Sequence, residues 1–359
     1  MRECLRLAEL GKGSVSPNPM VGAVLVRRGK VIGRGYHKRF GGAHAEVRCF
    51  QSVQGSCKGA TLYVNLEPCS YYGKTPPCAD LVIASGVCEV FIAMKDPNPL
   101  VAGRGIRKLR SAGIKVHVGL LQPEAERLNR FFIRYITSRR PYVHVKIAQT
   151  LDGMIAGPRG VSSWFTSPAS RRLVHRMRAD HDAILVGAGT IRSDNPRLTV
   201  RAVRGKDPHV VILDGRLRLP PKARVFESAR KRLVCVCTTR KAAARRAGIV
   251  TTLRRAGVQV LEFENPSSTL RLRSVLGRLH ELHIGSVLVE GGRQVFSQFI
   301  REDLIDELSI FIAPKLMGKG IPAFDERSRA AFSKLMAASS VSVDKTDGDV
   351  LIKSVVREE

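Results

Sequence analysis

Three side chains in this sequence are of the types that bind a catalytic metal ion, and they are its most informative residues. His44, Cys69 and Cys78 offer one imidazole nitrogen and two thiolates. This donor set suits Zn²⁺ and leaves the fourth tetrahedral position open for water. Three protein ligands with an open position are typical of catalytic zinc sites, whereas structural sites use four. The sequence therefore predicts a catalytic zinc site.

A carboxylate next to this site has the position of a general acid and base. Glu46 follows His44 near the start of a predicted helix over residues 44–53, where it can reach the water without binding the metal. Zinc lowers the pKa of a bound water towards ~7, so hydroxide is available to attack an amino-bearing ring carbon. Glu46 is then predicted to carry the proton to the departing ammonia.

The wider pattern is that of a zinc deaminase. His-x-Glu followed by Pro-Cys matches this class, although residues 70–77 separate Cys69 from Cys78 where two residues are usual. Taken singly, the histidine and the cysteines are typical of ordinary buried side chains. We expect that simpler role for the other cysteines, which are Cys4, Cys49, Cys57, Cys88, Cys235 and Cys237.

Length and composition limit the class of protein. The chain has 359 residues, which predicts two hydrophobic cores, and its 44% hydrophobic content excludes disorder as the main state. No apolar run reaches the about 18 residues of a membrane-spanning helix, and the N-terminus does not resemble a signal peptide. Eight cysteines without a secretory start indicate reduced thiols or metal ligands. We expect a cytoplasmic protein with no membrane partner.

The charge of the chain is strongly positive. Sixty Lys and Arg residues against 31 Asp and Glu give a formal net charge of +29, spread over both halves of the sequence. Such a field attracts anions, including phosphorylated metabolites, NADPH and nucleic acid. Nucleic-acid binding by stacking needs aromatic side chains, and only 6% of residues are aromatic. A small phosphorylated ligand is therefore the preferred partner, and nucleic acid is not.

The first half of the sequence alternates strands and helices. Two short β-branched runs, residues 21–27 and 30–36, flank Arg28-Gly29 and predict a hairpin. Strands are further expected at residues 60–66, 87–94 and 114–118, and helices near the N-terminus and at 76–85 and 103–112. This alternation predicts a three-layer α/β domain.

A second α/β domain is predicted after a break at residues 138–141. Its expected strands are residues 142–148, 183–186, 210–213, 233–237, 259–262, 286–289, 308–312 and 350–356. Its expected helices are residues 170–178, 270–279 and 294–299. The domain boundaries are therefore 1–140 and 141–359.

One glycine-containing turn in this second half could bind a phosphate group. Residues 289–292, Val-Glu-Gly-Gly, end a predicted strand and open a helix, where backbone amides can approach an anion. Many strand–helix turns contain Gly for geometry alone, and no Rossmann fingerprint is present. Taken singly, Asp152, Asp194 and Glu290 are expected to be solvated loop carboxylates.

Motifs along nearly the whole chain resemble the bifunctional riboflavin-biosynthesis deaminase-reductases. The motifs of the first half are residues 16–22, 35–37, 44–46, 66–69, 73–78 and 96–99; those of the second are 146–153, 162–166, 189–196 and 313–318. The resemblance implies a cytidine-deaminase-like three-layer domain followed by a dihydrofolate-reductase-like domain. It also implies zinc-dependent hydrolytic deamination of 2,5-diamino-6-ribosylamino-4(3H)-pyrimidinone 5′-phosphate, then reduction of the ribosyl to the ribityl chain with NADPH.

The same resemblance implies site residues. Asn18, His37 and Lys74 would hold the deaminase substrate, and Tyr71 stands where the family usually has His. NADPH would contact Ala148, Trp164, Thr190, Asp194, Gly291, Gly292, Arg293, Gln294, Val295, Phe296 and Ser297. The reductase substrate would contact Lys146, Ser162, Arg178, Leu198, Arg201 and Glu290. Since guanidinium groups pair with phosphate, Arg178 and Arg201 would grip the 5′-phosphate. Between residues 204 and 281 the match is loose, and we expect no catalytic residue there.

Two alternative functions remain open from the sequence. The first is a nucleic-acid base deaminase that uses the same zinc site and the positive field. The second keeps the deaminase and treats the second half as a non-catalytic assembly module. The resemblance also implies a homo-oligomer, because dimers and tetramers are common in the family.

Overall fold

The computed structural model describes residues 1–71, 76–99, 101–158, 160, 165–265, 269–325 and 340–356. The chain divides into two compact units, Met1–Arg140 and Pro141–Glu359. We call them the N-terminal unit and the C-terminal unit and describe each by itself.

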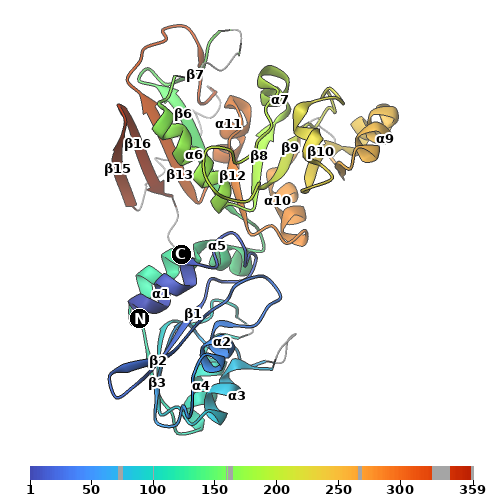
Figure 1. Ribbon diagram of the computed structural model, residues 1–359. Coiled ribbons are helices and arrows are strands. Elements are labelled where there is room, and N and C mark those ends of the chain that lie inside the picture. Colours follow the sequence, from blue (N-terminus) through green and yellow to red (C-terminus); the bar gives the residue numbers. More distant parts are fainter. Residues whose placement is uncertain are drawn as a thin grey trace. The chain divides into compact units, whose positions relative to one another are not determined.

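A mixed five-stranded sheet organises the described part of the N-terminal unit (Figure 1). The strands are β1 (Gly22–Arg27), β2 (Lys30–Tyr36), β3 (Thr61–Leu66), β4 (Glu89–Met94) and β5 (Lys115–Val118), in the order β2-β1-β3-β4-β5. β1 and β2 form the predicted hairpin, and its turn residues Arg28 and Gly29 both have positive φ, as a tight hairpin turn requires. β3, β4 and β5 are parallel.

Helices cover both faces of this sheet, as predicted for a three-layer domain. They are α1 (Arg2–Glu9), α2 (Ala45–Gln51), α3 (Cys78–Ala84), α4 (Arg104–Ser111) and α5 (Gln122–Ser138). Alternate residues of β1 point to opposite faces. Val24 packs with Cys4 and Leu7 of α1, whereas Ala23 and Leu25 belong to the larger core with α2 and α3. α5, the longest of these helices, is not predicted from the sequence.

A nine-stranded sheet organises the described part of the C-terminal unit. Its order is β11-β10-β9-β8-β12-β6-β13-β16-β15, parallel from β11 to β13 and antiparallel from β13 to β15. The strands are β6 (Tyr142–Thr150), β8 (Ala183–Gly187), β9 (His209–Leu213), β10 (Val234–Thr239), β11 (Gln259–Phe263), β12 (Ser286–Val289), β13 (Glu307–Ala313), β15 (Ser340–Thr346) and β16 (Asp349–Val355). β7 (Met154–Ala156) pairs separately with β14 (Ile321–Pro322).

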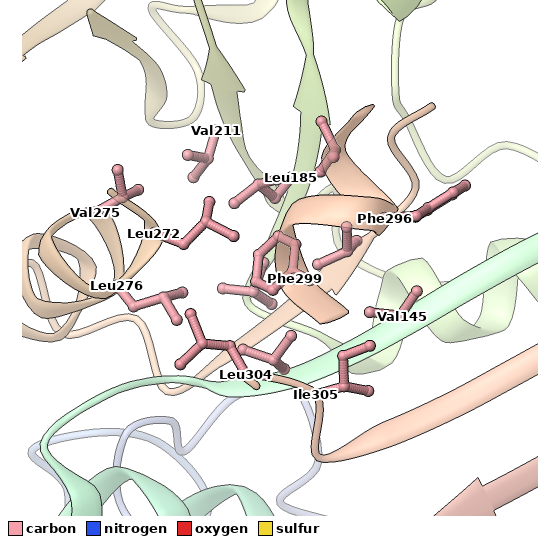
Figure 2. Close-up of a cluster of buried hydrophobic side chains, with 14 of the residues drawn as sticks. Val145, Leu185, Val211, Leu272, Val275, Leu276, Phe296, Phe299, Leu304 and Ile305 are labelled. Carbon is pink, nitrogen blue, oxygen red and sulfur yellow. The ribbon is translucent and has the colours of Figure 1, made fainter. Parts of the chain in front are cut away.

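Two hydrophobic cores lie on the opposite faces of this sheet. One joins the strands to α10 (Leu272–Glu281) and α11 (Arg293–Arg301), as Figure 2 shows for Phe299 among Leu185, Leu272 and Leu304. The other joins Ile184, Val186 and their neighbours to the 3-10 helix η1 (Arg224–Ser228) and to α9 (Ala247–Arg255). The remaining helices are α6 (Pro168–Asp180), α7 (Ala188–Asp194) and α8 (Arg240–Arg245).

Most of the predicted elements of the C-terminal unit are present within a few residues of their expected bounds. β7, α7, η1, α8, α9, β14 and β15 are not predicted from the sequence. Among the helices that the structure describes, none has both the length and the apolar character required to cross a membrane.

Candidate active sites

The three predicted zinc ligands converge in the N-terminal unit. His44 immediately precedes α2, Cys69 follows β3, and Cys78 is the first residue of α3. His44 Nδ1 lies 3.3 Å from Cys78 Sγ and 3.7 Å from Cys69 Sγ. One donor atom from each residue lies within 4.8 Å of the others. An imidazole and two thiols at this separation are a donor set that fits Zn²⁺.

The surroundings of the cluster favour a charged sulfur and a protonated carboxyl. A hydrogen bond from the Cys78 thiol, reinforced by His44 and by the Cys78 backbone N–H, lowers the pKa of Cys69 to about 4. Glu46, which is 4% exposed, has its pKa raised to about 7 because burial disfavours the carboxylate. Glu46 is therefore placed to hold a proton near neutral pH beside the three ligands.

Gly35 of β2 allows α2 to pack closely against the sheet. A Cβ atom at Gly35 would lie 2.3 Å from the backbone nitrogen of Cys49 and 2.4 Å from the carbonyl oxygen of Ala45. Contacts this short do not occur between real atoms, so any side chain at Gly35 would push α2 away. Because α2 carries Glu46 and follows His44, this glycine sets the position of the cluster.

Asn18 and His37, predicted to hold the substrate, lie beside the cluster. The His37 ring meets the His44 ring edge to face, with centroids 5.7 Å apart. His37 Nδ1 donates to the carbonyl oxygen of Ala43 at 3.0 Å, which leaves Nε2 to accept from the Asn18 amide at 3.2 Å. Burial lowers the pKa of His37, so the ring is neutral. The pair presents polar groups next to the metal ligands.

Other residues of the deaminase motifs have different roles. Glu67 is buried and accepts from the backbone N–H groups of Asp96, Gly103 and Ile106, so it fastens the start of α4. Tyr71 is exposed, and Lys74 lies outside the described residues.

The other cysteines differ from expectation in one case. Cys4, Cys49, Cys235 and Cys237 are buried and Cys57 is partly buried, but Cys88 is exposed. The expectation that Cys88 is a buried side chain is therefore wrong, because it lies in the short segment before β4, outside the sheet.

The C-terminal unit contains a cavity of about 990 Å³ at the carboxyl ends of its parallel strands. Candidate residues from both predicted sets line it: Lys146, Ala148, Arg178, Thr190, Asp194, Leu198, Arg201, Glu290, Gly291, Gly292, Arg293, Gln294, Val295 and Phe296. β8 and β12 are parallel neighbours, and α7 and α11 begin directly after them at this edge. Two helix N-termini thus face one cavity, where backbone amides favour phosphate groups.

Close packing explains the glycines at these two strand ends. A Cβ atom at Gly187 would lie 2.9 Å from the Val295 side chain, and one at Gly291 would lie 2.8 Å from it. Gly292, in contrast, has open space with Thr190 at 3.8 Å. Val295 therefore fills the space beside both turns, and only glycine fits at Gly187 and Gly291 without displacing it.

Glu290 differs from the expectation of a solvated loop carboxylate. Its side chain is 6% exposed and accepts from Arg178 Nε at 2.7 Å and Nη2 at 2.9 Å, with Lys146 Nζ at 3.3 Å. Burial opposes its charge, but attraction to Arg178 and Lys146 outweighs burial and holds the pKa of Glu290 well below its usual range. The expectation is wrong because two cations replace water around the carboxylate.

The same contacts give Arg178 a structural role. Its Nη1 donates to the carbonyl oxygen of Thr199 at 3.1 Å, so three of its nitrogens are engaged within the protein. Arg178 therefore orients Glu290; it also lines the cavity with Arg201, and the contact of both with the 5′-phosphate stays a prediction.

Two further site predictions need comment. Ser297 does not line the cavity: it is fully buried on α11, and its hydroxyl accepts from the backbone N–H of Asp325 at 2.9 Å. It lies one turn inside the helix, and its contact with NADPH stays a prediction. Ser162 and Trp164 lie outside the described residues.

Arg232 supports the segment that lines this cavity and is not predicted from the sequence. Its buried guanidinium donates to the carbonyl oxygens of Arg197, Leu198 and Pro208, each at 2.7 Å. Leu198 has positive φ, so these bonds hold the chain in an unfavourable conformation three residues before Arg201. Arg232 lies in the stretch where no catalytic residue is expected, and no spacing distinguishes it from the other arginines.

The fold and the two sites define a zinc-dependent deaminase domain joined to an α/β domain with an anion-binding cavity. Residues 1–94 match the cytidine and deoxycytidylate deaminase zinc-binding region, and residues 141–351 match the RibD C-terminal domain. The chain belongs to the RibD family of bifunctional riboflavin-biosynthesis enzymes.

Relatives with both domains support this membership. The riboflavin biosynthesis protein RibD of Aquifex aeolicus is 43% identical over 326 residues, which cover 90% of this chain and 89% of that protein. RibD of Escherichia coli is 38% identical over 331 residues, covering 89% and 88%.

Solved structures agree over the whole chain. The diaminohydroxyphosphoribosylaminopyrimidine deaminase/5-amino-6-(5-phosphoribosylamino)uracil reductase of Thermotoga maritima has a TM-score of 0.85 and 40% identity. Acinetobacter baumannii RibD has a TM-score of 0.86 and 35% identity. Each alignment covers 99% of this chain and 97% of the other.

The predicted fold class and bifunctional activity are therefore confirmed. The protein is a riboflavin-pathway enzyme that combines a zinc-dependent deaminase with an NADPH-dependent reductase and acts on a small phosphorylated molecule. A nucleic-acid base deaminase is not favoured, and the C-terminal unit is a reductase domain, not an assembly module.

Proposed function

We propose that residues 1–140 hydrolyse the 2-amino group from 2,5-diamino-6-ribosylamino-4(3H)-pyrimidinone 5′-phosphate. Residues 141–359 then reduce the ribosyl to the ribityl side chain of the product. The convergence of His44, Cys69 and Cys78 around a buried Glu46 carries this proposal. The Thermotoga protein, named for both activities, supports the order of the two steps.

In the deaminase, His44 Nδ1, Cys69 Sγ and Cys78 Sγ would hold Zn²⁺, which supplies the Lewis acidity that makes water nucleophilic at neutral pH. Glu46 takes a proton from the attacking water and delivers it to the amino group, which leaves as ammonia. Asn18 and His37 bind the pyrimidine edge, and Lys74 completes the substrate site. Because His37 is neutral, it orients the ring by hydrogen bonding rather than by charge.

In the reductase, the N-termini of α7 and α11 would bind the phosphates of NADPH, which supplies the hydride. The proposed cofactor contacts are then Ala148, Trp164, Thr190, Asp194 and residues 291–297. Open space above Gly292 lets a phosphate approach the backbone amides closely.

The reductase substrate would lie against the Glu290 cluster. Lys146, Leu198 and Glu290 line this part of the cavity, and Ser162 is proposed as a further substrate contact. Arg178 holds Glu290 in place through its bidentate hydrogen bond and, with Arg201, would bind the 5′-phosphate. Arg201 lies three residues after Leu198, whose carbonyl oxygen accepts from Arg232.

The cellular setting is part of the proposal. We place the enzyme in the cytoplasm as a homo-oligomer that does not bind nucleic acid. The free cysteines fit a reducing compartment, and the low aromatic content does not fit base stacking. Light scattering measures the oligomer, and a salt titration with a long polyanion tests the last point.

One experiment separates the two activities. The purified protein receives the diamino-pyrimidinone ribosylamine 5′-phosphate with and without NADPH, and ammonia and NADPH absorbance are followed separately. We expect ammonia release without NADPH, and NADPH oxidation only when deaminated product is present. NADPH oxidation that precedes ammonia release would contradict the proposed order.

A further inference from the structure

Two buried asparagines clamp one backbone unit next to the deaminase site. The amide oxygen of Asn129 accepts from the Met20 N–H at 2.8 Å, and its amide nitrogen donates to the Met20 carbonyl oxygen at 3.0 Å. Asn65 donates to the same carbonyl at 3.0 Å and accepts from the Gly22 N–H at 2.7 Å. Both polar groups of the Met20 backbone are therefore bonded to side-chain amides.

These asparagines come from distant parts of the N-terminal unit. Asn65 lies on β3 and is 0% exposed, and Asn129 lies in the middle of α5 and is 1% exposed. Asn129 is outside residues 1–94, which match the deaminase zinc-binding region. α5 therefore supplies a polar contact to a site whose recognisable motifs all lie earlier in the chain.

Asn129 is an unfavourable choice for the helix that contains it. Asn has a low helix propensity, and a buried amide must find partners for its donors and acceptor. At Asn129 the helix departs from helical geometry, with φ −97° and ψ 15°. Both described hydrogen bonds of its amide go to Met20. Asn129 therefore stabilises the Met20 backbone, although it disrupts the geometry of its own helix.

The Met20 segment connects directly to the substrate residues. Asn18 precedes Met20 in the same loop, and its amide reaches His37 Nε2 at 3.2 Å. The next residue, Val21, accepts from the His37 backbone N–H at 2.9 Å. The position of the Met20 backbone therefore fixes both Asn18 and His37, and the His37 ring contacts the ring of His44.

We infer that Asn129 is a positioning residue of the deaminase, which holds Asn18 and His37 in register with the zinc ligands through the backbone of Met20. The inference rests on the proposed function of Asn18 and His37. It assigns α5 to the deaminase site, although no atom of Asn129 touches the metal ligands in the described contacts.

The test uses the two activities of one chain as internal controls. Asn129→Leu keeps the volume of the side chain and removes both hydrogen bonds to Met20. We expect deaminase kcat/KM to fall about tenfold, mainly through KM, because the two hydrogen bonds that hold the Met20 backbone are lost. Zinc content and NADPH oxidation on deaminated substrate are expected to stay at the wild-type level.

Two further variants make the test specific. Asn129→Asp keeps an oxygen that can accept from the Met20 N–H, so we expect it to recover part of the loss. Gln122→Ala removes an exposed amide from the same helix, and we expect no change in KM. If Asn129→Leu does not fold, Asn129→Asp is judged by the same KM, zinc and NADPH measurements.

The possible outcomes decide the question. A raised deaminase KM with unchanged zinc and reductase activity supports the inference. A deaminase KM within twofold of wild type overturns it, and so does a parallel loss of zinc or of both activities, which would show a role in folding alone. A wild-type enzyme that releases no ammonia contradicts the proposed function instead.

Discussion

The two active sites are built in opposite ways. The deaminase groups come from two short sequence segments: His44 with Glu46 at the start of α2, and Cys69 after β3 with Cys78 at the start of α3. The reductase cavity takes its lining from at least five elements between Lys146 and Ile321. The compact site depends on ligand chemistry that is visible in the sequence, whereas the extended site depends on how strands and helices are arranged. Single substitutions are therefore expected to abolish chemistry at the deaminase site, and to reduce stability or substrate affinity at the reductase site.

The largest effect is expected from Glu46→Gln. The amide cannot transfer the proton, so ammonia release should fall about 10³-fold, within the range for loss of a general acid and base. Zinc content and NADPH oxidation on deaminated substrate should remain, because Glu46 is not among the three ligand residues. Metal analysis and the two separate assays measure this.

The matched control is Glu89→Gln, which alters a partly exposed carboxylate of the same unit that pairs with His117. We expect it to leave both activities unchanged. Loss of NADPH oxidation in Glu46→Gln would show that the two sites are not independent.

A change in stability is expected from Glu290→Gln. The variant leaves Lys146 and Arg178 buried without their anion, so the C-terminal unit should lose about 3 kcal/mol of unfolding free energy. Scanning calorimetry should show one transition shifted by roughly 6–12 °C. Glu281→Gln removes an exposed ion pair on α10 and should shift the transition very little.

The pH dependence sharpens this prediction. Because the folded state lowers the pKa of Glu290 from 4.5, its contribution is fully present above about pH 4.5 and is lost as pH falls through the folded-state pKa. The difference between wild type and Glu290→Gln should therefore shrink below pH 4.5. A difference that grows in acid would contradict the ion-pair assignment.

The smallest effect is expected from Arg232→Met. The substitution removes the N–H donors to the carbonyl oxygens of Arg197, Leu198 and Pro208. We expect the reductase KM for its phosphorylated substrate to rise about tenfold, since the segment that precedes Arg201 is no longer fixed. Deaminase kinetics should not change. Arg230→Met, at an exposed arginine two positions earlier, serves as the control, and an equal effect there would refute a specific role.

The sequence is informative where function depends on residue type and short spacing. The zinc ligands, Glu46 and the buried parallel strands of both units are recognisable because soft ligands and continuous apolar runs have distinct patterns. The Glu290–Arg178 pair is not recognisable in this way, since its two partners come from elements far apart in the chain.

β15, α5 and Arg232 are not predicted because the burial of their side chains leaves no recognisable pattern in the sequence. β15 lies at an edge of the sheet, where Val341 and Val343 are exposed, so few of its residues need to be apolar. α5 buries few of its residues and departs from helical geometry at Asn129. Arg232 is one of many arginines in a basic chain, and only the folded structure shows that its side chain is buried.

The hairpin of β1 and β2 has a consequence for how the protein can be altered. At its tip, Gly29 has nothing within 4 Å of an added Cβ atom, so the turn has room for an attached label. Six positions along, a Cβ atom at Gly35 would lie 2.3 Å from the backbone nitrogen of Cys49 in α2. The hairpin therefore runs from a turn that offers space to a position where any side chain would displace α2.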